Sequence, residues 1–124
     1  LTGGLAASRR EGFPSEFRLA RIEFAAEQLR FFPHGDGGRG RGAKVMAFET
    51  AAKAITEFYP LQPRKKPIMV GFFGGEPLLA KDLIRRVVAF TERTYGKTGC
   101  KFHITTNGTL IDEEWARFIG QHNF

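Results

Sequence analysis

Residues 68–79 read Ile-Met-Val-Gly-Phe-Phe-Gly-Gly-Glu-Pro-Leu-Leu, and this stretch decides the fold. Its first six residues form a continuous apolar run of strand length, bounded by Pro67 and by two glycines. Such a run predicts a strand buried on both faces, as in parallel sheets. After Pro77 we expect a helix that Gly96 and Gly99 end. Its inward stripe is predicted to consist of Leu79, Leu83, Val87 and Phe90.

Helices and strands continue to alternate on both sides of this stretch. Apolar residues recur at helical spacing over residues 48–59, and Pro60 ends that pattern. In residues 101–106 polar and apolar side chains alternate, and strand-favouring residue types are frequent, so this stretch predicts a second strand. A turn at Asn107-Gly108 is expected to follow it. Asp112 can cap a last helix. The apolar stripe of that helix is predicted to be Trp115, Phe118 and Ile119.

The first third of the chain is less periodic. Residues 1–18 read as a leader, and residues 33–43 form a loop too rich in glycine for regular structure. Between them, residues 21–24 alternate like a short strand, while residues 25–29 favour helix. Both interpretations of residues 18–32 remain open from the sequence.

The alternation predicts an α/β fold with parallel strands joined by crossover helices. We expect two regions: residues 1–43, poorly defined, and residues 44–124, the α/β part. Ligand sites in such folds lie beyond the carboxyl ends of the strands. The stretches at 74–77 and 107–109 both occupy that position, so they are predicted to share one rim.

The stretch Gly74-Gly75-Glu76-Pro77 combines three useful features. Two glycines let the backbone approach a ligand closely or adopt positive φ, and the proline stiffens the entry into the helix. The carboxylate between them, beside exposed backbone groups, suits a ligand that bears an ammonium group. Read alone, the same residues also fit a tight turn with a solvated glutamate.

The stretch Thr105-Thr106-Asn107-Gly108 offers hydroxyl and amide groups. These groups suit a hydroxyl-rich ligand such as a ribose. An ordinary Asn-Gly turn is the alternative interpretation.

Taken together, Phe72 to Leu79 and Ile104 to Leu110 resemble the radical S-adenosylmethionine (radical SAM) enzymes. The likeness is to the branch that matures peptides and sulfatases, which often carries an additional C-terminal cluster domain (SPASM-type). Residues 46–55 also resemble that branch's first barrel helix, and the resemblance covers residues 44–119.

The resemblance implies the N-terminal part of a partial (β/α)6, TIM-like barrel. It also implies S-adenosylmethionine as cofactor, with Gly74, Gly75, Glu76 and Pro77 at its methionine end. Thr106 and Asn107 are implied near the active-site rim. The family uses a 4Fe–4S cluster to cleave this cofactor to a 5′-deoxyadenosyl radical, and this branch acts on a peptide or protein substrate.

The family's cluster motif, Cys-x3-Cys-x2-Cys, is missing from this sequence. The chain has one cysteine, Cys100, expected at the start of a strand and opposite the rim. At the matching spacing stand Glu27, Phe31 and His34, which cannot replace three thiolates. No metal site is therefore predicted, and we expect the chain to be inactive alone.

Three origins fit the missing motif. The chain is a degenerate or truncated gene product, a noncatalytic remnant that binds the cofactor or a peptide, or a corrupted reading of a normal enzyme. The chain begins with Leu1 and ends in a short helical pattern, so we expect a longer protein, with self-association or a missing C-terminal half.

Composition and charge bear on whether the protein is a membrane, secreted or nucleic-acid-binding protein. The chain has 124 residues, 26% of them charged, a net charge of +6 and no apolar run of membrane-spanning length or secretory leader. We expect a cytoplasmic protein without membrane partners. The basic stretches at 39–42 and 64–66 permit nucleic-acid binding, but no recognition motif accompanies them, so a solvated basic loop is favoured.

Overall fold

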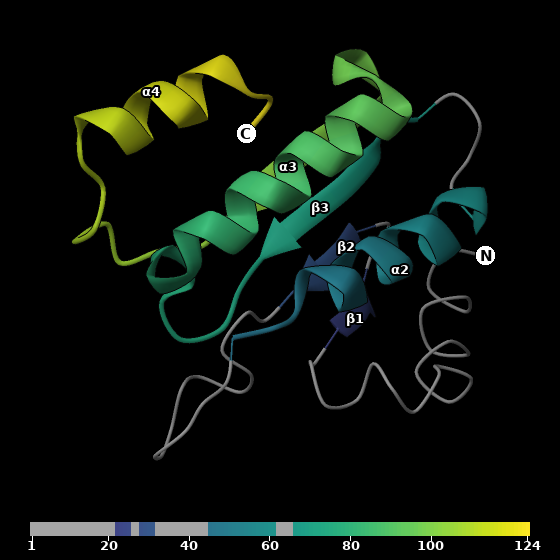
Figure 1. Cartoon of the computed structure of the whole chain (residues 1–124), viewed down its shortest axis with the longest axis horizontal. Helices are drawn as coiled ribbons and strands as arrows, with labels where there is room; N and C mark the ends of the chain where they lie inside the picture. Colours follow the sequence, from purple (N-terminus) through teal and green to yellow (C-terminus); the bar gives the residue numbers. More distant parts are fainter. Residues whose placement is uncertain (1–21, 26–27, 32–44, 62–65) are drawn as a thin grey trace.

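The computed structural model describes residues 22–25, 28–31, 45–61 and 66–124. Within these ranges it shows an α/β fold with one mixed sheet (Figure 1). The predicted leader, the loop at 33–43, and the basic residues 39–42, 64 and 65 lie outside the described residues. No helix in the described part of the chain is long and apolar enough to cross a membrane.

The sheet has four strands in the order β1-β2-β3-β4: β1 (Ile22–Ala25), β2 (Gln28–Phe31), β3 (Ile68–Phe72) and β4 (Cys100–Ile104). β2, β3 and β4 run parallel, as the sequence predicts, and β1 pairs antiparallel with β2. The alternation at 21–24 therefore indicated a strand correctly for residues 22–24, and the helix favoured for 25–29 is wrong for residues 25, 28 and 29. Sheet pairing outweighs weak local helix propensity here.

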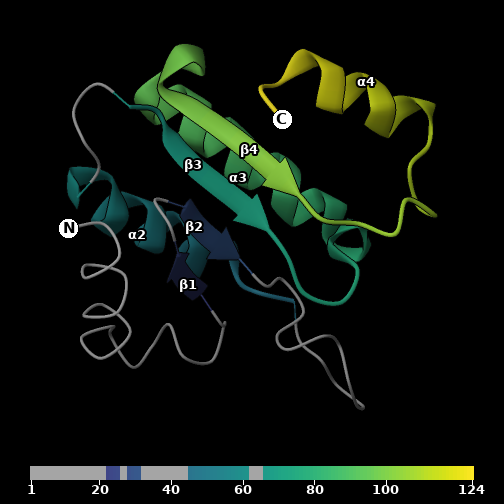
Figure 2. The same cartoon turned by 180° about the vertical axis from the view of Figure 1, so that it is seen from behind.

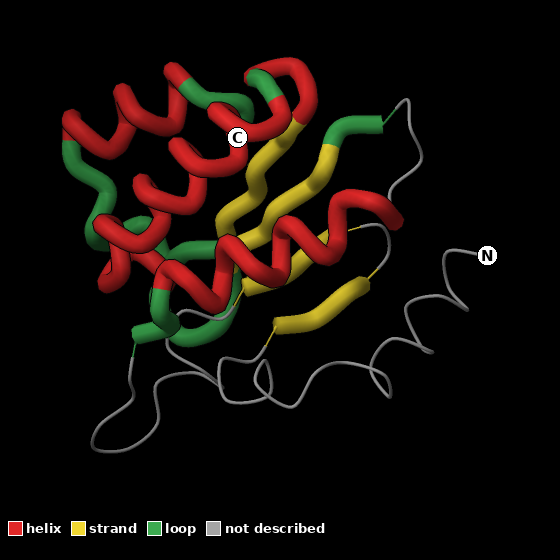
Figure 3. Tube along the Cα trace, turned by 45° about the vertical axis from the view of Figure 1, so that its right-hand side comes forward, coloured by secondary structure: helices red, strands yellow, loops and turns green. Residues whose placement is uncertain are grey.

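Two of the helices pack on one face of the sheet. α2 (Phe48–Phe58) and α3 (Lys81–Tyr95) lie side by side in front of the strands in Figures 1 and 3. Figure 2, from behind, shows the opposite face of the sheet, which no described helix crosses. The described core lies between the helices and the sheet, with fully buried residues from each layer: Ile55, Ile68, Val70, Phe72, Ile84 and Val88.

The inward stripe of α3 differs in one position from the prediction. Leu79 is 66% exposed, whereas Leu78 is buried. The reason is that residues Pro77–Ala80 form a 3₁₀ turn, η3, which precedes the α-helix and has a tighter repeat. The phase of the buried face therefore shifts by one residue at the start of the helix.

The last helix, α4 (Glu113–Gln121), packs beside α3 (Figures 1 and 2). Asp112 caps it as predicted, since its Oδ1 accepts from the Trp115 amide at 2.7 Å. After α4 the chain returns to β4, where the Phe102 amide donates to the Asn123 carbonyl at 2.7 Å. The C-terminal residues thus pair with the outer edge of β4 near its start.

This arrangement agrees with the α/β prediction and its parallel strands. The short 3₁₀ turns η2 (Tyr59–Leu61) and η4 (Lys97–Gly99) lie at helix ends near the start of the parallel strands. β3 and β4 both end at the opposite edge, where the predicted rim lies.

Candidate functional site at the carboxyl ends of β3 and β4

The two predicted loops do lie together. Because β3 and β4 are parallel and paired in register, with Phe72 opposite Ile104, the residues that follow them leave the sheet at the same edge. The Thr105 amide donates to the Phe72 carbonyl at 3.1 Å, which extends the pairing by one residue. This pairing fixes the spacing between the two loops.

The first loop turns sharply through its glycines. Gly74 has φ 79° and Gly75 has φ 48°, both in the left-handed region that glycine adopts without strain. Gly74 is half-buried and Gly75 is exposed. Pro77 is buried and begins η3, as expected for a proline in the first turn of a helix.

Glu76 lies between the glycines and this turn, and its carboxylate connects both loops. Its Oε2 accepts from the Leu78 amide at 3.0 Å, which caps η3. Its Oε1 accepts from the Asn107 amide at 3.0 Å. The Thr106 hydroxyl, 2.5 Å from Oε1 and 2.9 Å from Oε2, donates to the same carboxylate.

The second loop is held by its own side chains. The Gly108 amide donates to Thr106 Oγ1 at 3.1 Å. The Asn107 side-chain oxygen accepts from both the amide and the hydroxyl of Thr109, at 2.9 and 2.7 Å. Asn107 therefore forms the Asx-type turn expected of an Asn-Gly sequence. Its side-chain oxygen is engaged within the loop.

These contacts change how the predicted site residues are understood. Gly74, Gly75, Glu76, Pro77, Thr106 and Asn107 do lie at one rim. The Glu76 carboxylate, however, serves as an internal connection between the loops. Sequence reasoning missed this role because glutamate is not a favoured capping residue and its partner lies 30 positions away.

Two carbonyl groups of the first loop accept no backbone hydrogen bond from the described residues, whereas the Glu76 carbonyl accepts from the Leu79 amide at 3.1 Å. In the part of the chain that the structure describes, the carbonyl oxygens of Gly74 and Gly75 accept no backbone hydrogen bond. Carbonyls without a backbone donor can accept from another N–H group, including the three donors of an ammonium group.

The described residues at this rim do not form an iron site. Among the described residues there is no group of three histidine, cysteine or acidic side chains that could hold a metal ion. Cys100 is buried at the start of β4, the end opposite the loops, and donates to the Gly96 carbonyl at 3.3 Å. Phe31 is buried and packs with Phe72, while Glu27 and His34 lie outside the described residues.

Burial raises the pKa of the Cys100 thiol to about 11, and the charge of Glu92 adds to this effect. A thiol in this state is a poor metal ligand and a poor nucleophile, because both roles require the thiolate. The prediction that Cys100 is structural or incidental agrees with this environment.

Three known proteins show partial similarity to this chain. An uncharacterized protein of Methanocaldococcus jannaschii is 38% identical over 76 residues, which are 61% of this chain and 26% of that protein. Cysteine-type anaerobic sulfatase-maturating enzymes of Clostridium perfringens and Clostridium novyi are 39% and 40% identical over 56 and 55 residues. Each of those two matches covers 43% of this chain and 15% of the enzyme. The chain thus spans about a quarter or less of these relatives. No protein-family model matches it.

Proposed function

We propose that this chain is related to the radical SAM enzymes and that its rim binds the methionine end of S-adenosylmethionine. Partial similarity to two sulfatase-maturating enzymes supports the relationship, in agreement with the resemblance of residues 72–79 and 104–110. The observation that carries the proposal is the pair of carbonyls at Gly74 and Gly75, at the carboxyl edge of a parallel sheet, which accept no backbone hydrogen bond from the described residues.

Some residues at the rim would bind the cofactor, and others would hold the binding loop in place. The carbonyl oxygens of Gly74 and Gly75 would accept hydrogen bonds from the ammonium group of the cofactor. Glu76 and Thr106 would hold this loop against the next one, so that the carbonyls keep their orientation before the ligand arrives. The negative charge of Glu76 nearby would add an electrostatic attraction for the ammonium group.

The 4Fe–4S cluster of the family does not fit the residues of this chain. With one cysteine in the whole sequence, and that thiol buried at the far end of β4, no three-thiolate site can form within one chain. We therefore propose binding of the cofactor without its reductive cleavage. Modification of a peptide or protein, the activity implied by the resemblance, would require a cluster supplied by residues beyond this sequence.

Calorimetric titration with S-adenosylmethionine tests the binding proposal. Gly75→Ala is the informative variant, because a side chain at φ 48° strains the loop that presents the carbonyls. Gly96→Ala is the matched control: its φ is 82°, an added Cβ meets nothing within 4 Å, and it lies at the other end of the sheet. We expect binding by the unaltered chain and by Gly96→Ala, and weaker binding by Gly75→Ala.

Equal binding by Gly75→Ala and Gly96→Ala would show that this loop does not contact the cofactor. No binding by the unaltered chain would refute the proposal. The absence of cleavage is tested separately by anaerobic reconstitution with iron and sulfide. We expect neither the broad brown absorption of a cluster nor 5′-deoxyadenosine. Either product would contradict the assignment of this chain as a binding protein only.

A further inference from the structure

Asn107 and Gly108 lie in the loop that leads from β4 to α4 (Figure 2), and their own chemistry goes beyond the cofactor site. The main-chain nitrogen after an asparagine can attack the carbonyl carbon of the asparagine side chain, and glycine leaves that nitrogen unhindered. Both residues are exposed. A Cβ built on Gly108 would meet nothing within 4 Å, so the turn has open space beside it.

The Asn107 side chain is folded back over Gly108. Its Oδ1 accepts from the Thr109 amide at 2.9 Å. The ring closed by this hydrogen bond contains both the side-chain carbonyl carbon of Asn107 and the main-chain nitrogen of Gly108. Because an N–H group donates only to an acceptor, the contact also fixes which end of the Asn107 amide faces Thr109. The carbonyl carbon is therefore held close to the nitrogen that would attack it.

Two donors lie where negative charge would develop during such an attack. Besides the Thr109 amide, the Thr109 hydroxyl donates to Asn107 Oδ1 at 2.7 Å. Attack on the carbonyl carbon moves charge onto this oxygen, and donors already in place stabilise that charge, as in the oxyanion holes of acyl-transfer enzymes. Thr109 thus activates the Asn107 carbonyl group.

The proton of the Gly108 nitrogen has a path to a base. The Gly108 amide donates to Thr106 Oγ1 at 3.1 Å, and the Thr106 hydroxyl donates to the Glu76 carboxylate at 2.5 and 2.9 Å. Glu76 can take the hydroxyl proton while Thr106 takes the amide proton, so a carboxylate activates the nucleophile through an intervening group. The N–H lies in the peptide plane, whereas attack occurs perpendicular to it, so this hydrogen bond leaves the attack open.

We propose that this loop promotes the deamidation of its own Asn107. The Gly108 nitrogen forms a bond to the side-chain carbonyl carbon of Asn107 as its proton passes through Thr106 to Glu76. The bond from that carbon to the side-chain nitrogen then breaks, and ammonia leaves with the transferred proton. Water opens the resulting cyclic imide to aspartate or isoaspartate, so one water is consumed and one ammonia is released for each Asn107.

The modification would alter the connection between the two loops. Either product replaces a neutral amide by a carboxylate near the Glu76 carboxylate, and like charges repel. Isoaspartate also adds a methylene to the main chain next to the Asn107 amide, which donates to Glu76 at 3.0 Å. The rim would therefore loosen as the protein ages. This proposal does not depend on cofactor binding.

The experiment compares the unaltered chain, folded in buffer and unfolded in urea, at the same neutral pH. Trypsin places Asn107 and Asn123 in separate peptides, residues 102–117 and 118–124. Mass spectrometry then follows the replacement of each amide by a carboxyl group. Asn123 is the internal control, because Phe124 follows it and its side-chain nitrogen donates to the Cys100 carbonyl. We expect Asn107, but not Asn123, to react at least about tenfold faster in the folded chain.

Four variants test the two activating residues. Thr106→Val removes the path to Glu76, and we expect it to slow deamidation of the folded chain about 100-fold. Thr109→Val removes one of the two donors to Oδ1 and should slow it at least about tenfold. Thr106→Ser and Thr109→Ser are the matched controls, since each keeps the hydroxyl and should keep the rate. If Thr106→Val unfolds, as judged by circular dichroism, Glu76→Gln replaces it, because it removes the base and keeps the size of the side chain.

Deamidation of Asn107 that is equally fast or slower in the folded chain would overturn the proposal, because the hydrogen bonds would then protect the side chain. Equal slowing by the serine and valine variants would also overturn it, since packing and not the hydroxyl groups would set the rate. No cofactor is present in these incubations, so their outcome and that of the titrations with S-adenosylmethionine are independent.

Discussion

The Thr106 hydroxyl lies 2.5 Å from Glu76 Oε1, and this contact joins two loops that are 30 residues apart in sequence. The same carboxylate accepts from the amides of Leu78 and Asn107. One glutamate thus caps the turn after β3 and fixes the start of the loop after β4. The rim is therefore a preassembled unit, and its stability can be measured without any ligand.

We expect Thr106→Val to lower the free energy of unfolding by about 1 kcal/mol, since it removes one hydrogen bond to a charged acceptor at a half-buried site. Glu76→Gln should cost about 1–3 kcal/mol, because it weakens three donor contacts at once. Urea unfolding followed by circular dichroism measures both. The double variant should cost less than the sum of the two single variants, because they share the contact.

Thr94→Val is the control for this cycle. Its hydroxyl also donates at short range, to the Phe90 carbonyl at 2.7 Å, but it is exposed on α3 and far from Glu76 along the sheet. We expect the effects of Thr94→Val and Glu76→Gln to add. Additivity in the Thr106 pair as well would contradict a direct connection between the loops.

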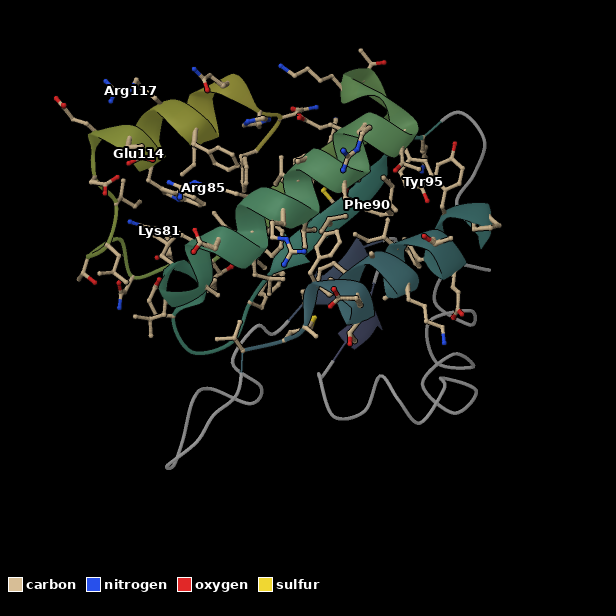
Figure 4. All side chains as sticks on the ribbon, viewed as in Figure 1. Lys81, Arg85, Phe90, Tyr95, Glu114 and Arg117 are labelled. Atoms are coloured by element: carbon tan, nitrogen blue, oxygen red, sulfur yellow. The ribbon has the colours of Figure 1, made fainter. Side chains whose placement is uncertain are left out.

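Trp115 attaches α4 to the rest of the fold. Its side chain is fully buried, and Phe118 stacks on it with centroids 4.7 Å apart. The guanidinium carbon of Arg85, on α3, lies 5.3 Å from the centroid of the Trp115 ring. Nη2 of Arg85 donates to Glu114 Oε1 at 2.8 Å (Figure 4). We expect Trp115→Ala to cost about 3–5 kcal/mol in urea unfolding, as for loss of a large aromatic side chain from a core.

Arg85→Gln separates packing from charge at the same contact. It keeps most of the side chain but removes the cation beside the ring and the ion pair with Glu114. We expect a loss of about 1 kcal/mol or less, since solvent-exposed ion pairs and cation–π contacts are weak. A cost equal to that of Trp115→Ala would show that charge, and not packing, holds α4.

Cys100 should resist alkylation in the folded chain. Its pKa is raised to about 11 by burial and by the charge of Glu92, so at pH 8 only about one thiol in a thousand would be ionised. An unfolded cysteine, with a pKa near 8.5, would be ionised to roughly a quarter. We expect iodoacetamide to label the unfolded chain at least about 100-fold faster, as followed by mass spectrometry. Similar rates would mean that the start of β4 is open.

Acid should weaken the cap of α4. The Trp115 amide, and then the Lys81 ammonium group, lower the pKa of the Asp112 carboxyl. A lowered folded-state pKa gives stability that is present above the ordinary carboxyl pKa and is lost as the pH falls through the folded value. We therefore expect the difference in unfolding midpoint between the unaltered chain and Asp112→Ala to shrink on acidification from pH 6.

Glu113→Gln controls for the general loss of charge in this pH series. It removes a carboxylate from the same helical turn without removing the Asp112 hydrogen bond. If Glu113→Gln abolished the pH dependence of the unfolding midpoint and Asp112→Ala left it intact, the dependence would come from Glu113. Our assignment to Asp112 would then be wrong.

Local signals in the sequence determined much of this fold. The apolar run before Gly74, the helical spacing of residues 48–59 and the Asp112 cap each depend on neighbours within a few positions, and each prediction agrees with the structure. The prediction that Leu79 faces inward was wrong, because residues 77–80 form a 3₁₀ turn whose repeat differs from that of the α-helix after it. The sequence also brought both loops to one rim, since parallel strands end together.

Tertiary structure alone decided what the side chains at that rim do. The contacts of Glu76 with Thr106 and Asn107 depend on the register of strands far apart in the chain. A shift of one residue would move each side chain to the opposite face. The residue types were therefore readable from the sequence, whereas their contacts were set by the pairing of β2, β3 and β4.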